Sequence, residues 1–165
     1  MIERPRTKGT APERPMLDQW LERHRATLAI KCDGLSADQM RMQSVPPSNL
    51  SPLGLVRHMA DVERWWFRVV LDGQPDEPHY WGRPDADSDF DDVATADVDA
   101  DLARWHEECE QARAIAAARD LDATGLDHGE PVSMRWVLVH MIEEYARHNG
   151  HADLLRERID GVTGD

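Results

Sequence analysis

The sequence has few cysteines, few basic residues and no long apolar stretch, and each shortage excludes a class of protein. Cys32 and Cys109 are the only cysteines among 165 residues, which is too few for a secreted disulfide scaffold. Nineteen basic residues stand against 32 acidic ones, giving a net charge of −13. This balance disfavours nucleic acid or an anionic membrane as the main partner, because phosphate-rich surfaces attract positive charge. No apolar run approaches the ~18 residues of a membrane-spanning helix.

The first residues also lack the features of a targeting segment. Residues 1–12 contain Pro5, Gly9 and Pro12 but no apolar stretch and no periodicity, so we expect a flexible arm rather than a secretory signal. A cytoplasmic protein is the resulting expectation. The remaining residues, 13–165, suffice for one domain, and 41% hydrophobic residues suffice for its core.

Apolar residues recur at helical spacing in four segments, each of roughly 20–27 residues. No segment alternates apolar and polar residues for long enough to indicate a strand. The pattern therefore predicts an all-α fold, and in particular a four-helix bundle. The predicted helices are residues 13–33, 52–72, 101–119 and 134–159.

Local signals mark where several of these helices begin and end. Ser51 followed by Pro52 predicts the start of the second helix, since serine caps a helix and proline fits its first position. Thr95 or Asp97 can cap the third helix, and Gly161 is expected to end the fourth.

The connection between the second and third helices, residues 73–93, is much longer than two packed helices require. It is rich in aspartate and proline, so we expect a long loop. Such a loop allows the chain to cross over, and it can cover one end of the bundle. Within this loop, Trp81 is the candidate for a residue that covers a functional site at that end of the bundle.

Eight histidines are the feature that most needs an explanation, and helical geometry separates some of them. His148 lies near the centre of the apolar face of the fourth helix, so its ring is expected to point into the bundle. Glu144 lies one turn earlier on the flank of that face, whereas His151 and His140 lie nearer solvent. His58 lies on the flank of the apolar face of the second helix.

A carboxylate and an imidazole four residues apart share one face of a helix and can share a metal ion. A third ligand from a facing helix would leave coordination positions open for water or substrate, as in catalytic sites. Such donors suit zinc, iron(II) or nickel. The same spacing also occurs as an ordinary side-chain pair, so histidines satisfied within a core are the alternative.

Two stretches of the sequence carry a resemblance to known proteins: LSPLGLVRHMADVERWWF at 50–67 and HMIEEYARHNGHADLLRERIDG at 140–161. They resemble the DinB/YfiT-like superfamily, particularly its actinobacterial branch, and the likeness extends from about Trp20 to Gly164. The resemblance implies a four-helix bundle with a long connection between its second and third helices. Members are often dimeric, so a homodimer is expected.

The resemblance also implies a divalent metal ion held by one histidine of the second helix and a pair four residues apart on the fourth. Carried over to this sequence, the ligands are His58, Glu144 and His148. Glu144 stands where the superfamily commonly has a histidine, and His151 is the rival third ligand. Zinc is the first candidate for the ion, with nickel or iron as alternatives.

Characterised relatives use such an ion to activate a low-molecular-weight thiol, such as mycothiol or bacillithiol. We therefore expect an enzyme that transfers a mycothiol-type thiol to a small electrophile, since a bound cation lowers the pKa of a thiol. Trp65, Trp81 and Arg147 are the candidate pocket residues. Cys32 and Cys109 have no basic cluster beside them and are expected to be buried and inert. The alternatives are a metal-dependent hydrolase and a non-enzymatic dimeric binding or stress protein with a vestigial metal site.

Overall fold

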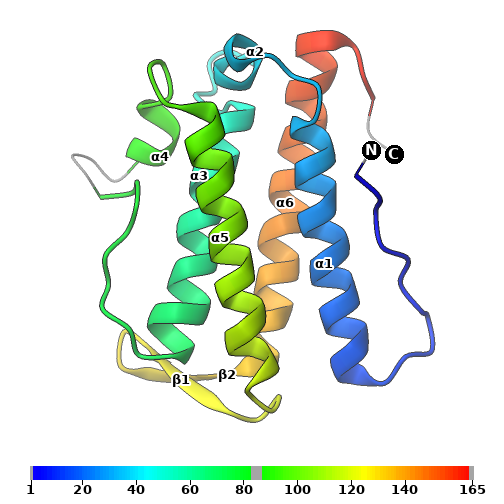
Figure 1. Cartoon of the computed structure of the whole chain (residues 1–165), viewed down its shortest axis with the longest axis vertical. Helices are drawn as coiled ribbons and strands as arrows, with labels where there is room; N and C mark the ends of the chain where they lie inside the picture. The colour runs from blue at the N-terminus through cyan, green and yellow to red at the C-terminus, as the bar shows by residue number, and fades with distance from the viewer. Residues whose placement is uncertain (1, 83–86, 164–165) are drawn as a thin grey trace.

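The computed structural model describes residues 2–82 and 87–163. The chain is mostly helical, which confirms the all-α prediction. Its long helices lie roughly side by side (Figure 1). Within the described part of the chain, none of the helices combines the length and the apolarity that crossing a membrane requires. In chain order the helices are α1 (Glu13–Cys32), α2 (Ala37–Arg41), α3 (Pro52–Glu63) with its π-helical continuation η1 (Arg64–Leu71), α4 (Ser88–Asp91), α5 (Val98–Ala117) and α6 (Met134–Asp160).

The predicted helix ends are confirmed by the contacts of their capping residues. The Ser51 hydroxyl accepts a hydrogen bond from the Gly54 amide at 3.0 Å, and Pro52 follows as the first residue of α3. Asp97, rather than Thr95, caps α5, because its carboxylate accepts from two backbone amides of the first turn. Gly161 ends α6 in the left-handed conformation, with φ of 78°, which glycine adopts without steric cost.

The helix α3 occupies the middle of the fold and is covered on nearly every side. It contacts α2, α4, α5 and α6, and of its 12 residues only His58 is not fully buried. Three charged residues of α3 are buried together with its apolar residues: Arg57, Asp61 and Glu63. Burying a charge is costly unless it is paired, so each of these side chains must find a partner across the core.

Residues 2–12 run alongside α1 (Figure 1). The Lys8 amide donates a hydrogen bond to the Gln19 side chain, and Arg23 donates to the Pro5 carbonyl. These contacts attach the amino-terminal segment to the outer face of α1.

The connection between α1 and α3 and the predicted 73–93 loop each contain a short helix. α2 lies in the first connection, where Ser36 and Gln39 cap each other reciprocally, an arrangement that satisfies two free amides at a helix start. α4 lies within the predicted 73–93 loop and packs on α3. Residues 83–86 of that loop fall outside the described residues.

The prediction that no segment forms a strand is wrong. β1 (Thr124–Asp127) and β2 (Glu130–Ser133) pair antiparallel and close the end of the molecule near η1 (Figure 1). The two residues between them, His128 and Gly129, both have positive φ, 47° and 89°, as the favoured two-residue hairpin turn requires. Strands of four residues are too short to show a clear alternation, which explains why the apolar pattern gave no signal.

The hairpin packs tightly on η1 at Gly125, so we expect Gly125→Ala to destabilise the protein. A Cβ atom here would meet the Val70 carbonyl oxygen and would lie 2.8 Å from the Leu71 Cα. Both are backbone atoms, so the two segments must move apart, at a typical cost of about 1–3 kcal/mol. Equilibrium urea unfolding measures this loss.

Gly150→Ala in α6 is the matched control, because nothing lies within 4 Å of its added methyl group. Alanine is the better helix former, so this variant should be at least as stable as the parent. Equal stability of both variants would contradict the close approach at Gly125.

Candidate functional site

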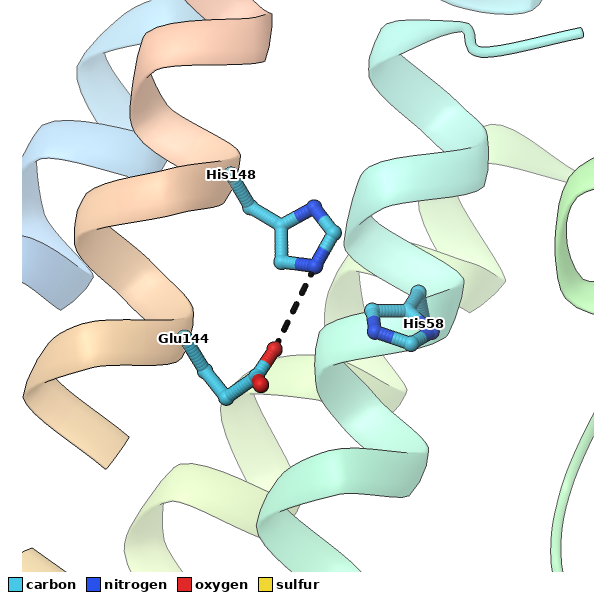
Figure 2. Close-up of side chains that lie close together, drawn as sticks. All are labelled: His58, Glu144 and His148. Carbon is cyan, nitrogen blue, oxygen red and sulfur yellow. Dashed lines mark ion pairs between the residues drawn. The ribbon is translucent and has the colours of Figure 1, made fainter. Parts of the chain in front are cut away.

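The three ligands expected from the sequence come together between α3 and α6 (Figure 2). His58, Glu144 and His148 each offer one donor atom, and these atoms all lie within 4.8 Å of one another. His148 Nε2 lies 3.4 Å from Glu144 Oε2, and the His58 and His148 rings have centroids 4.7 Å apart. Two imidazoles and a carboxylate form a donor set that suits a divalent transition metal ion.

The α6 part of this group is buried, and its surroundings hold His148 in the neutral form. Burial, with the nearby His58, His151 and Arg147, lowers the pKa of His148 to about 3. A neutral imidazole keeps a lone pair that can bind a metal ion. Glu144 is also buried, and one of its oxygens accepts a hydrogen bond from Arg147 at 2.9 Å, while the other faces His148.

His58 has a second partner that the sequence pattern did not indicate. Its Nδ1 lies 2.8 Å from Oδ2 of Asp89, a residue of α4. Asp89 is buried, although it belongs to the aspartate-rich connection. Figure 2 shows the other ring nitrogen of His58 turned toward Glu144 and His148.

A surface pocket of about 340 Å³ opens beside His58. Phe90 stacks on the His58 ring at a centroid distance of 4.9 Å, and the Trp81 ring lies edge-on at 6.3 Å. Trp81 thus lies where a residue covering the site was expected. The residues lining the pocket are His58, Trp81, Gly82, Asp87, Asp89 and Phe90.

Asp61, one turn after His58 on α3, holds the Trp81 segment in place. Its carboxylate accepts hydrogen bonds from the backbone amides of His79, Tyr80 and Trp81 at 2.7, 2.8 and 2.9 Å. In the sequence this aspartate is typical of a solvated helix face, and only the packing of the distant loop shows its role. The aromatic side of the pocket is therefore anchored to the same helix that carries His58.

The other predicted site residues lie around this centre rather than in it. Trp65 packs against His128 of the hairpin turn at a centroid distance of 5.2 Å and does not line the pocket beside His58. Arg147 is exposed and pairs with Glu143 and Glu144. His151 Nδ1 lies 3.4 Å from His148 Nδ1, the ring nitrogen that does not face Glu144.

A neighbouring group of donor atoms shares Glu144 with the first. His140, Glu143 and Glu144 also lie within 4.8 Å of one another. All three residues of this second group come from one helix, whereas the first group joins α3 and α6 and includes two imidazoles. The group formed with His58 is therefore the better candidate for a metal ion.

The two cysteines are buried, as expected. Burial raises the pKa of Cys32 to about 12. Burial, together with the nearby Glu63, also raises the pKa of Cys109 well above its ordinary value. Since the thiolate is the nucleophilic form, neither side chain can serve as the reactive sulfur.

Comparison with known proteins agrees with the resemblance seen in the two sequence stretches. A family model described as mycothiol S-transferase matches residues 16–161. No curated protein matches the chain. The match runs from the first turn of α1 to the residue that follows α6, and it includes the three residues that converge in Figure 2. The chain therefore belongs to the mycothiol S-transferase family, a DinB/YfiT-like family of actinobacteria.

Proposed function

We propose that this protein is a metal-dependent enzyme that transfers mycothiol, or a thiol of the same type, to a small electrophile. The observation that carries the proposal is the convergence of His58, Glu144 and His148 beside an aromatic-walled pocket. Family membership indicates mycothiol as the thiol, and the two imidazoles and the carboxylate indicate a metal ion. Zinc is the first choice of ion, with nickel or iron(II) as alternatives.

Glu144 is the third ligand in this proposal, and His151 is not. His148 Nε2 faces Glu144, whereas His151 contacts Nδ1 on the other side of the same ring. An ion bound between His58 and the Nε2 side of His148 would have Glu144 within reach. His151 is then a hydrogen-bond partner of a ligand, a role that commonly orients metal-bound histidines.

The chemistry follows from what each group can do. A divalent cation, when bound, lowers the pKa of a thiol and so favours the thiolate at neutral pH. The thiolate sulfur then forms a bond to the electrophilic carbon, and the leaving group departs with its bonding electron pair. Trp81 and Phe90 offer apolar surface to the electrophile, while the buried Cys32 and Cys109 take no part.

We further propose that residues 13–165 form a single DinB-like four-helix-bundle domain and that two copies associate. The exposed Trp136 and Val139 on α6, 46% and 53% accessible, support association. Sedimentation at several concentrations tests this, and a monomer throughout would contradict it.

The test of the function combines metal analysis with a thiol-dependent assay. Protein reconstituted with zinc, nickel or iron(II) should hold about one ion per chain, as a three-ligand catalytic site does. With mycothiol and 1-chloro-2,4-dinitrobenzene as the probe electrophile, loss of the electrophile should require both thiol and protein. Chelation should abolish this loss, and adding the metal back should restore it.

Two outcomes would contradict the proposal. Electrophile loss that proceeds at the same rate without a thiol would indicate a hydrolase. Absence of bound metal after reconstitution with each of the three ions would indicate a binding protein rather than an enzyme of this type.

A further inference from the structure

The contact between His58 and Asp89 joins the candidate metal centre to the segment that walls the pocket. Asp89 Oδ2 lies 2.8 Å from His58 Nδ1, and the Asp89 side chain is only 3% exposed. The other oxygen, Oδ1, accepts from the Phe90 amide at 3.1 Å. Both carboxylate oxygens are therefore engaged, and the direction of the side chain is fixed.

The α4 turn that carries Asp89 is itself attached to α3 at two residues that precede His58. The Arg57 guanidinium donates to the backbone carbonyls of Asp89 and Ser88, at 3.1 and 3.0 Å. At Gly54 the absence of a side chain lets Phe90 approach, since a Cβ atom would lie 3.1 Å from Phe90 Cδ1 and 3.3 Å from its Cα. Arg57, next to His58, and Gly54, one turn before it, thus fix the position of α4 on α3.

This arrangement determines which nitrogen of His58 carries the proton. A carboxylate can only accept a hydrogen bond, so the hydrogen lies on Nδ1 of His58. The lone pair of the neutral ring is then on Nε2, the nitrogen turned toward Glu144 and His148 (Figure 2). The partner of His148 is different in kind, because the imidazole of His151 can donate or accept and imposes no tautomer.

We propose that Asp89 is a positioning residue that holds His58 as the Nδ1-protonated tautomer and directs its Nε2 lone pair at the cation. The inference rests on the proposed function, because it assigns Asp89 a role toward the same metal centre. Carboxylate partners of this kind fix ring orientation and raise ligand basicity, and their loss typically lowers metal affinity roughly 10–100-fold. The long connection between α3 and α5 thereby acts on the centre without supplying a ligand.

The test uses Asp89→Asn, which keeps the shape of the side chain but places an amide where the carboxylate was. Zinc affinity, measured by competition with a chromophoric chelator and no thiol present, should fall about 10–100-fold. Asp89→Ala, which leaves Nδ1 to water, should change affinity in the same direction. Asp91→Asn on the same turn is the control, because its carboxylate is exposed and accepts only from Asn49 at 2.8 Å in the described structure.

A second readout separates positioning from general destabilisation. In the metal-free protein with ¹⁵N-labelled histidine, the His58 ring nitrogens should report the Nδ1-protonated tautomer. In Asp89→Asn they should report a mixture, while circular dichroism shows an intact helical fold.

Unchanged zinc affinity and an unchanged tautomer in Asp89→Asn would overturn the role of Asp89. If His58→Ala still abolishes zinc binding in that case, the proposed metal centre stands without it. Absence of zinc binding in the parent protein would overturn both.

Discussion

His148→Ala is expected to abolish stoichiometric metal binding, and with it all thiol-dependent turnover. His148 is buried on α6, is held neutral by its surroundings and faces Glu144 at 3.4 Å. Loss of an outer partner of a ligand costs roughly 10–100-fold in affinity, so loss of the ligand itself should cost more than about 100-fold. Metal analysis after gel filtration measures the binding, and the mycothiol assay measures the activity.

The control is His106→Ala, which removes an exposed histidine of α5 whose ring lies tilted against that of Trp105 and which has no place in the proposed centre. It should retain the metal content and activity of the parent. His148→Gln, closer in volume to histidine, should lose the metal as His148→Ala does, which separates ligand loss from a packing defect. Full metal content in both His148 variants would contradict the proposed ligand set.

The α6 half of the centre was predictable because its information is local. Glu144 and His148 are one turn apart, and the apolar residues around them set the direction in which they point. Caps such as Ser51 and Gly161 are equally local, so the main helix boundaries were correct to within a few residues. That α6 faces α3, by contrast, was predicted from the family resemblance rather than from periodicity.

What the sequence could not indicate depends on contacts between distant segments. Asp89 follows His58 by 31 residues, and no periodic pattern shows that α4 folds back onto α3. Past Glu63 the chain continues as the π-helix η1, and Trp65 packs against His128 of the hairpin rather than in the pocket beside His58. The hairpin did leave one signal, Gly129 between two short segments, since glycine is the preferred second residue of a two-residue hairpin turn.

The second large effect concerns Glu63, whose buried carboxylate links all the long helices. Glu63 on α3 is fully buried and accepts two hydrogen bonds from Arg25 on α1, at 2.7 and 2.5 Å. The Tyr145 hydroxyl on α6 donates to the same carboxylate at 2.7 Å and accepts from Trp105 on α5 at 2.9 Å. Burial alone would lower the pKa of Arg25, but the charge of Glu63 raises it well above its ordinary value. Arg25 thus stays charged inside the core.

Glu63→Leu is therefore expected to destabilise the fold by about 3–5 kcal/mol, because it leaves the buried Arg25 charge without its main partner. The variant in which Arg25→Met accompanies Glu63→Leu should recover most of this loss, since replacing a buried ion pair by apolar residues is often neutral or stabilising. Urea unfolding of the parent, both single variants and the double variant gives the coupling energy of the pair. In the double variant the Tyr145 hydroxyl still accepts from Trp105 but has lost its own acceptor, which accounts for the part of the loss that is not recovered. Additive losses in the cycle would show that Arg25 and Glu63 stabilise the protein independently, and would remove the reason for a charged network at the centre of an apolar core.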